Sequence, residues 1–137
     1  MKRILLSALA LALCLLAPGR TAAAQGYVVV VNAAGPASLS KTELSNVFLK
    51  KSTKLTPVDQ QKGAGVRDAF SKAVLGRPTS AVATYWQQQI FAGKDVPPPE
   101  KGSDAEVLAY VKSTPNGIGY VAAGTELGAG VKAVTIQ

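Results

Sequence analysis

An apolar stretch near the start of the sequence decides how much of the chain is available to fold. Residues 4–17 are almost entirely apolar and follow the basic pair Lys2 and Arg3. As a helix this stretch would be roughly 21 Å long, which is shorter than the ~30 Å hydrocarbon core of a membrane. A short apolar segment behind a positive start is typical of a secretory signal peptide. We therefore expect residues 1–24 to be removed and residues 25–137 to form a single folded domain outside the cytoplasm.

The expected cleavage site lies between Ala24 and Gln25, because Ala22 and Ala24 supply the small side chains that a signal peptidase reads. Two alternatives remain open. The segment could stay as an uncleaved membrane anchor, or Cys14 could be lipidated as in bacterial lipoproteins. The bulky Leu13 before Cys14 disfavours lipidation, and the length of the apolar run disfavours an anchor. We expect no stable membrane anchor.

The composition of residues 25–137 leaves little material for enzyme chemistry. The sequence has no histidine, and its single cysteine, Cys14, lies in the expected leader. The usual general base, thiolate nucleophile and soft metal ligands are therefore missing, and no disulfide can form. The leader also carries three of the 15 basic residues, so its removal lowers the formal net charge from +7 to +4. We expect no enzyme activity, no cofactor and no metal.

Hydrophobic patterning predicts strands alternating with helices. Five β-favouring residues in a row, Tyr27 to Val31, indicate a strand covered on both faces. Capping boxes at Ser40 and Ser103, each with a glutamate three residues on, mark the starts of two helices. The expected elements are strand 27–31, helix 40–50, strand 55–59, helix 66–75 closed by Gly76, helix 78–93, a helix from 103, and strands 118–122 and 131–136. This order favours an α/β fold with a mixed sheet flanked by helices.

The third predicted helix carries an apolar face made of Val82, Tyr85, Trp86 and Ile90. Residues at this spacing lie on one side of a helix and normally pack into a core. We therefore expect Trp86 to be buried, and its replacement by alanine to cost roughly 3–5 kcal/mol of folding free energy.

The segment Gly63-Ala64-Gly65-Val66-Arg67 is the best candidate for a binding site. A glycine-rich turn that runs into a helix presents backbone N–H groups and the positive end of the helix dipole to an anion. Arg67, together with Lys62, would add positive charge. The same glycines could instead make only a tight turn, with Arg67 in solvent or paired with an acidic neighbour, and short glycine patterns alone do not separate these readings.

Two further patterns have simpler explanations. Ser38-Leu39-Ser40-Lys41 matches the S-x-x-K motif of serine acyltransferases, but its companion motifs are missing and Ser40 already has a capping role. Lys50, Lys51 and Lys54 cluster near one loop. Without a recognisable nucleic-acid-binding module, we interpret them as a solvated surface and expect no nucleic-acid partner.

In order along the chain, these segments resemble the phosphate-binding proteins of bacterial ABC importers, which have the type II periplasmic binding protein fold. Residues 28–32 resemble the family's first strand, and residues 39–50 its "L-S-x-x-x-L-x-x-I-F-x-G-K" helix. Residues 63–70 resemble "G-S-G-T-R-D-A-F", and residues 114–121 resemble "x-P-G-A-I-G-Y-V". The resemblance implies a periplasmic, single-lobe domain that binds a phosphate-like anion at Gly63, Ala64, Gly65, Val66 and Arg67.

The sequence departs from the family's pattern at the ligand. Family members have two lobes that close on phosphate, whereas this chain has the length of about one. Ala64 and Val66 stand where the family has serine and threonine, and Gln60 stands where a family arginine holds the phosphate. We therefore expect an exported anion-binding accessory domain with weak affinity. The alternative is a ligand-free scaffold that retained the fold and binds an envelope protein.

Overall fold

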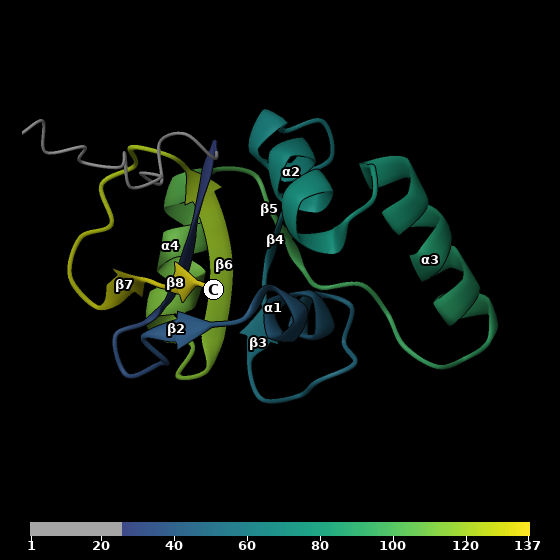
Figure 1. The fold of residues 1–137 in the computed structure, drawn as a ribbon, viewed down its shortest axis with the longest axis horizontal. Coiled ribbons are helices and arrows are strands. Elements are labelled where there is room, and N and C mark those ends of the chain that lie inside the picture. Colours follow the sequence, from purple (N-terminus) through teal and green to yellow (C-terminus); the bar gives the residue numbers. More distant parts are fainter. Residues whose placement is uncertain (1–25) are drawn as a thin grey trace, which may run out of the picture.

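The computed structural model describes residues 26–137, so the expected signal peptide and its cleavage site lie outside the described residues. A four-stranded sheet forms the centre of the fold, with strand order β3-β6-β1-β7 (Figure 1). Its strands are β1 (Tyr27–Asn32), β3 (Thr56–Pro57), β6 (Gly117–Ala122) and β7 (Val131–Ala133). Strand β1 pairs antiparallel with both β6 and β7, while β3 runs parallel to β6. The expected mixed sheet is confirmed.

Two short parallel pairs extend this frame. Strand β2 (Ser38–Leu39) pairs with β8 (Thr135–Ile136), and β4 (Asp59–Gln60) pairs with β5 (Glu100–Lys101). The β4–β5 pair brings residues about 40 positions apart side by side, next to the start of the second helix. The patterning of the sequence predicts neither β2 nor β5, because two residues carry no detectable alternation.

The helices are α1 (Lys41–Phe48), α2 (Gly65–Phe70), α3 (Thr79–Phe91) and α4 (Asp104–Ser113). The predicted capping box at Ser40 is present: its hydroxyl accepts from the Glu43 N–H, and the Glu43 carboxylate accepts from the Ser40 N–H. At Ser103 the hydroxyl caps the helix as expected, but Glu106 accepts from the N–H of Gly102 instead. Helix α2 continues into a π-helical turn, η2 (Ser71–Leu75), which ends at Gly76 with φ 67°. That left-handed conformation favours glycine, as the predicted cap requires.

The sheet is buried on both faces, as the valine run of β1 predicts. Val29 and Val31 pack toward α1 and α2, together with Leu44, Phe48 and Phe70. Val30 faces the opposite side, where it packs with residues of α4 and neighbouring strands: Val58, Val107, Val111, Val121 and Val131. Figure 1 shows α4 on one side of the sheet and α1 and α2 on the other.

Helix α4 lies very close to the sheet at Gly119. A Cβ atom at this position would come within 2.7 Å of Val107 and 2.8 Å of Val58. Only glycine fits between these two side chains, so Gly119 allows α4 to pack this close to the sheet.

Helix α3 stands at one end of the molecule, separated from the sheet by α1 and α2 (Figure 1). Val82 and Trp86 are buried, with Trp86 only 5 % exposed, which confirms the expectation for Trp86. Tyr85 donates a hydrogen bond to the backbone oxygen of Leu49 and so ties α3 to the end of α1. Ile90 does not continue the buried face, because it is 53 % exposed. No helix within residues 26–137 is long and apolar enough to cross a membrane.

Candidate functional site

The predicted glycine-rich segment forms a turn that leads into α2. Gly63 has φ 86°, a backbone conformation that favours glycine, and Gly65 is the first residue of the helix. The N–H of Ala64 donates to the backbone oxygen of Gln61 at 3.3 Å and closes the turn. One of the backbone donors expected at an anion site is therefore used inside the turn itself. Gly63 and Gly65 are exposed, whereas Ala64 and Val66 are half-buried.

The side chain of Arg67 points inward from α2 and is almost fully buried. Its Nη1 atom donates to the backbone oxygen of Gln60 at 2.8 Å and to Oε1 of Glu100 at 2.8 Å. Its Nη2 atom lies 3.6 Å from Oδ2 of Asp59. Arg67 is thus the centre of an ion-pair network that joins α2 to both strands of the β4–β5 pair. Much of its positive charge is already balanced by protein carboxylates.

Asp59 is held in this network by two further contacts. It accepts hydrogen bonds from the Tyr120 hydroxyl and from the N–H of Gln60. Burial raises the pKa of Asp59, and the Tyr120 hydrogen bond and the charge of Arg67 offset only part of that effect. Burial and the nearby Asp59 raise the pKa of Tyr120. Burial alone would lower the pKa of the Arg67 guanidinium group. Asp59 and Glu100 outweigh this effect of burial, so the pKa is raised.

Gln60 has a structural role. Its amide Nε2 donates to Oδ1 of Asp104 at 2.8 Å and to the backbone oxygen of Tyr120 at 3.0 Å. The side chain therefore fastens β4 to β6 and to the start of α4. It occupies the position where the resemblance implies a phosphate-binding arginine, and here both of its amide hydrogens are used within the protein.

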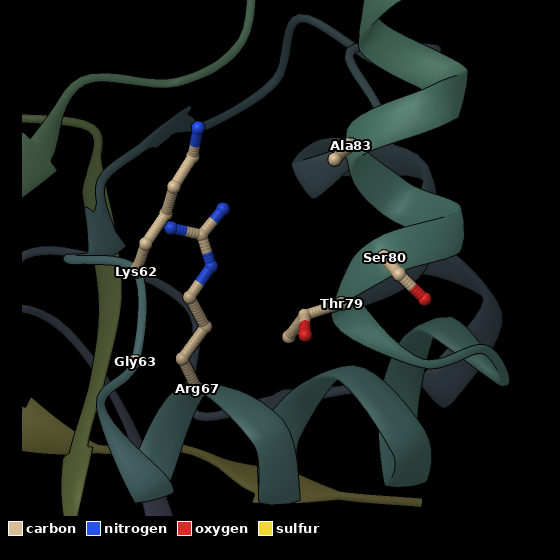
Figure 2. A pocket seen from close by; sticks show the side chains of 6 residues that line it. All are labelled: Lys62, Gly63, Arg67, Thr79, Ser80 and Ala83. Atoms are coloured by element: carbon tan, nitrogen blue, oxygen red, sulfur yellow. The ribbon is translucent and has the colours of Figure 1, made fainter.

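A small pocket opens between the glycine turn and α3. It has a volume of about 260 Å³ and is lined by Lys62, Gly63, Arg67, Thr79, Ser80 and Ala83. Figure 2 shows Lys62 and Arg67 along one wall and the first turn of α3 along the other. Pockets for drug-sized ligands are roughly 300–1,000 Å³, so this one suits a small ion or a single side chain.

Sequence reasoning identified one wall of this pocket and missed the other. Gly63 and Arg67 line it, but Ala64, Gly65 and Val66 do not. Thr79 and Ser80 line the opposite wall, where the Thr79 hydroxyl donates its hydrogen to Oδ1 of Asp68 at 3.2 Å and the Ser80 hydroxyl points away from Lys62 and Arg67 (Figure 2). No sequence signal connects these residues with the glycine turn, because the contact depends on how α3 folds back over α2.

The other sequence motifs have structural roles. Ser40 of the S-x-x-K pattern is engaged in the capping box, and Trp86 is buried, which leaves it unavailable for stacking on bases. Within residues 26–137, no group of three or more acidic, histidine or cysteine side chains is placed to hold a metal ion.

Comparison with solved structures confirms the fold. The chain is similar to an ABC-type phosphate transport receptor from Vibrio cholerae, with a TM-score of 0.62 and 17 % identity over 81 % of this chain. It is also similar to a protein from Clostridium perfringens described as a phosphate ABC transporter substrate-binding protein with bound phosphate, with a TM-score of 0.60 and 18 % identity over 81 % of this chain. A third similar structure, described as a possible phosphate-binding protein from Planctomyces limnophilus, has a TM-score of 0.58 and 16 % identity over 82 % of this chain.

The likeness covers 46 %, 44 % and 41 % of those three chains, so this chain spans less than half the length of each. No protein-family model matches the chain, and no curated protein matches its sequence. The expected resemblance to phosphate ABC transporter binding proteins is therefore confirmed as a similarity of fold, in a mixed α/β domain that corresponds to about one lobe of them.

Proposed function

We propose that this chain is an exported, non-catalytic binding domain that holds a small phosphate-like anion weakly in the pocket between the glycine turn and α3. The observation that carries the proposal is the pocket itself, which places Lys62 and Arg67 along one wall of a small space, opposite the first turn of α3. The similar solved structures are described as a phosphate transport receptor, a protein with bound phosphate and a possible phosphate-binding protein, which supports an anion as the ligand and a link to phosphate transport.

Lys62 is the main source of free positive charge in this proposal. It is exposed at the mouth of the pocket, and among the described residues it makes no ion pair. Arg67 contributes less, because an anion must share it with Asp59 and Glu100. The Thr79 hydroxyl already donates its one hydrogen to Asp68, and the Ser80 hydroxyl points away from Lys62 and Arg67 (Figure 2), so neither replaces the donors missing at Ala64 and Val66.

The affinity should be well below that of a dedicated importer. The resemblance implies three polar contacts that are absent at Gln60, Ala64 and Val66, and a hydrogen bond to a charged group is worth roughly 1.5–3 kcal/mol. Their combined loss could remove about 4–9 kcal/mol, or roughly three to six orders of magnitude in affinity. The pocket also opens to water, which weakens each remaining electrostatic contact.

Titration calorimetry with phosphate and sulfate at physiological salt tests the proposal. We expect saturable binding with a dissociation constant on the order of 1 mM, lost at high salt. Lys62→Gln should weaken binding about fivefold or more, whereas Lys72→Gln, an exposed control outside the pocket lining, should leave it unchanged. A dissociation constant near or below ~1 μM would contradict the assignment of a weak site. No saturable heat with either anion would contradict anion binding altogether.

The internal pairing of Arg67 favours a second candidate. In this candidate, the charge of Arg67 is balanced by Asp59 and Glu100, and the side chain has the structural role of holding α2 against the β4–β5 pair. The chain would then be a scaffold that binds an envelope protein. Absence of anion binding together with a specific, saturable partner in cross-linking from the envelope would favour this candidate.

A further inference from the structure

The exposed apolar side chains of this protein are concentrated at one place. Ile90, Phe91 and Val96 are 53 %, 93 % and 58 % exposed, and they are the large hydrophobic residues that stand out in this way within residues 26–137. All three fall within seven residues at the end of α3, which we term the α3-end patch. Scattered exposed apolar residues need no explanation, but a local group of them indicates a contact surface.

The α3-end patch is a defined structure and not a frayed helix end. Gly93 has φ 66°, and its N–H donates to the backbone oxygen of Ile90 at 3.0 Å. The N–H of Lys94 donates to the backbone oxygen of Gln89 at 3.0 Å. These bonds close the helix in the way a left-handed glycine cap does. Asp95 then lies 3.6 Å from the ammonium group of Lys50, which anchors the following segment to the end of α1.

The surroundings of the patch are basic. Lys94 lies in the turn after α3, and the loop after α1, which Lys50 joins to Asp95, carries further lysines close by in the sequence: Lys51 and Lys54. Asp95 balances Lys50, and Glu43 on α1 is close enough to interact with Lys54. Within the described part of the chain, Lys51 and Lys94 make no ion pair. Uncompensated positive charge therefore lies next to the patch in the chain at Lys94, and at Lys51 beside the Lys50 that pairs with Asp95.

This combination decides between the possible occupants. A second copy of the chain would bring two basic surfaces together, which electrostatic repulsion disfavours. A stable protein interface buries roughly 20–30 residues on each side, far more than these three side chains. Binding to an anionic lipid surface brings no two basic surfaces together and does not need so large an interface. Aromatic and aliphatic side chains enter the boundary between headgroups and acyl chains, while lysines contact the anionic headgroups.

We propose that the α3-end patch binds reversibly to the surface of a bilayer that contains anionic lipids. Phe91 and Ile90 enter the boundary layer, and Lys51 and Lys94 contact the lipid phosphates. The α3-end patch shares no residue with the pocket beside α2, so failure of vesicle binding and failure of anion binding can be told apart.

The test is vesicle co-sedimentation of the exported protein, purified after export so that all variants share one N-terminus. Vesicles contain either phosphatidylcholine alone or phosphatidylcholine with about 30 % phosphatidylglycerol, a fraction high enough for a negative surface potential. We expect binding to the anionic vesicles that falls with added salt, and little binding to the neutral ones. Phe91→Ser should lower the partition coefficient about 10-fold, and Lys51→Gln with Lys94→Gln should lower it at least as much.

A matched control removes the same charge elsewhere. Lys112→Gln with Lys132→Gln changes two lysines on α4 and β7, at the opposite end of the molecule from α3 (Figure 1), and should leave vesicle binding unchanged. Equal losses in this control and in the Lys51/Lys94 variant would overturn the proposal, since binding would then depend on net charge alone. Failure of the wild-type protein to bind anionic vesicles would also overturn it. Two further outcomes would do the same: a dimer that Phe91→Ser dissociates in sedimentation velocity, or cross-linking from position 91 to an envelope protein without vesicle binding.

Discussion

The sheet with its flanking helices and the helix α3 use apolar side chains in opposite ways. In the first region, Val30 and Val31 of β1 and Val111 of α4 are fully buried, and both faces of the sheet are covered. In α3, Val82 and Trp86 are buried, while Ile90 and Phe91 are left in solvent. The sheet and its flanking helices form a closed core, whereas α3 packs along one side only and its C-terminal end is exposed.

Charged groups show the same contrast. Arg67, at the inner edge of the pocket, is matched by Asp59 and Glu100 within hydrogen-bond or ion-pair distance. The lysines near the end of α3 are matched only in part. A surface with unmatched apolar and basic groups is available for binding in a way that the buried network is not. The buried network therefore contributes to stability, whereas the end of α3 leaves apolar and basic groups exposed to solvent.

The largest expected effect is at Phe70, in the closed region. Its ring stacks on Tyr120 with centroids 4.0 Å apart and also contacts Phe48 at 4.7 Å. Phe70→Ala should lower the free energy of unfolding by about 3–5 kcal/mol, because it leaves a cavity at the centre of the aromatic cluster. Urea unfolding followed by circular dichroism measures this. Phe70→Leu keeps most of the volume and should cost clearly less. Equal losses for the two variants would show that cavity formation is not the cause.

Trp86→Ala should have the next largest effect, at the lower end of the ~3–5 kcal/mol expected for truncation of a buried aromatic residue. Trp86 is 5 % exposed but belongs to neither of the two core clusters. We expect its loss to release α3 while the sheet stays folded. Hydrogen exchange should then show reduced protection in residues 82–91 and unchanged protection in β1 and β6. Equal loss of protection throughout would show that α3 and the sheet unfold as one unit.

Sequence reasoning succeeded where a local pattern determined the structure. The valine run of β1, the capping box at Ser40 and the helix stop at Gly76 are confirmed because each depends on neighbouring residues alone. The exposure of Ile90 could not be predicted, because helical spacing shows which residues share a face but not how far the neighbouring structure extends along it. The structure that covers this face of α3 extends past Trp86 and stops before Ile90.

The candidate site was predictable only in part for a similar reason. The turn at Gly63 and the helix that follows are visible in the sequence, and so is the basic character of Arg67. Its partners are not visible, since Glu100 is 33 residues away and reaches Arg67 only through the β4–β5 pair. The second wall of the pocket, at Thr79 and Ser80, depends on the packing of α3 and has no signal of its own.

Asp59→Asn tests the buried network around Arg67. Asparagine can still accept a hydrogen bond from Tyr120, but its NH2 group would face the guanidinium group of Arg67 where Oδ2 of Asp59 now lies 3.6 Å away, so we expect a loss of about 1–3 kcal/mol. Because the pKa of Asp59 is raised in the folded protein, the folded state binds its proton more tightly than the unfolded state. The contribution of Asp59 to stability therefore decreases as the pH rises through the unfolded pKa of ~3.9 and on through the raised folded value.

It follows that the destabilisation by Asp59→Asn should be larger near pH 4 than near pH ~7. Unfolding in urea at a series of pH values, with wild type and variant compared at each, measures the difference. Glu43→Gln is a useful reference, because the pH dependence of its destabilisation should have the opposite sign. The capping bonds with Ser40 lower the pKa of Glu43, so the contribution of Glu43 to stability is lost as the pH falls. A destabilisation by Asp59→Asn that grows with pH would contradict the raised pKa of Asp59.

The smallest effect on stability is expected at Phe91, which is the counterpart of Phe70 in the open region. Its side chain is 93 % exposed, so folding removes almost none of its surface from water and truncation leaves no cavity. Phe91 is also the last residue of α3, where phenylalanine and serine have similar helix propensities. Phe91→Ser should therefore change the free energy of unfolding by no more than about 0.5 kcal/mol in urea, while it lowers vesicle binding about 10-fold. A loss above ~1 kcal/mol would mean that the ring packs against the protein in solution. The end of α3 would then be part of the closed region, and the contrast between the two regions would have to be withdrawn.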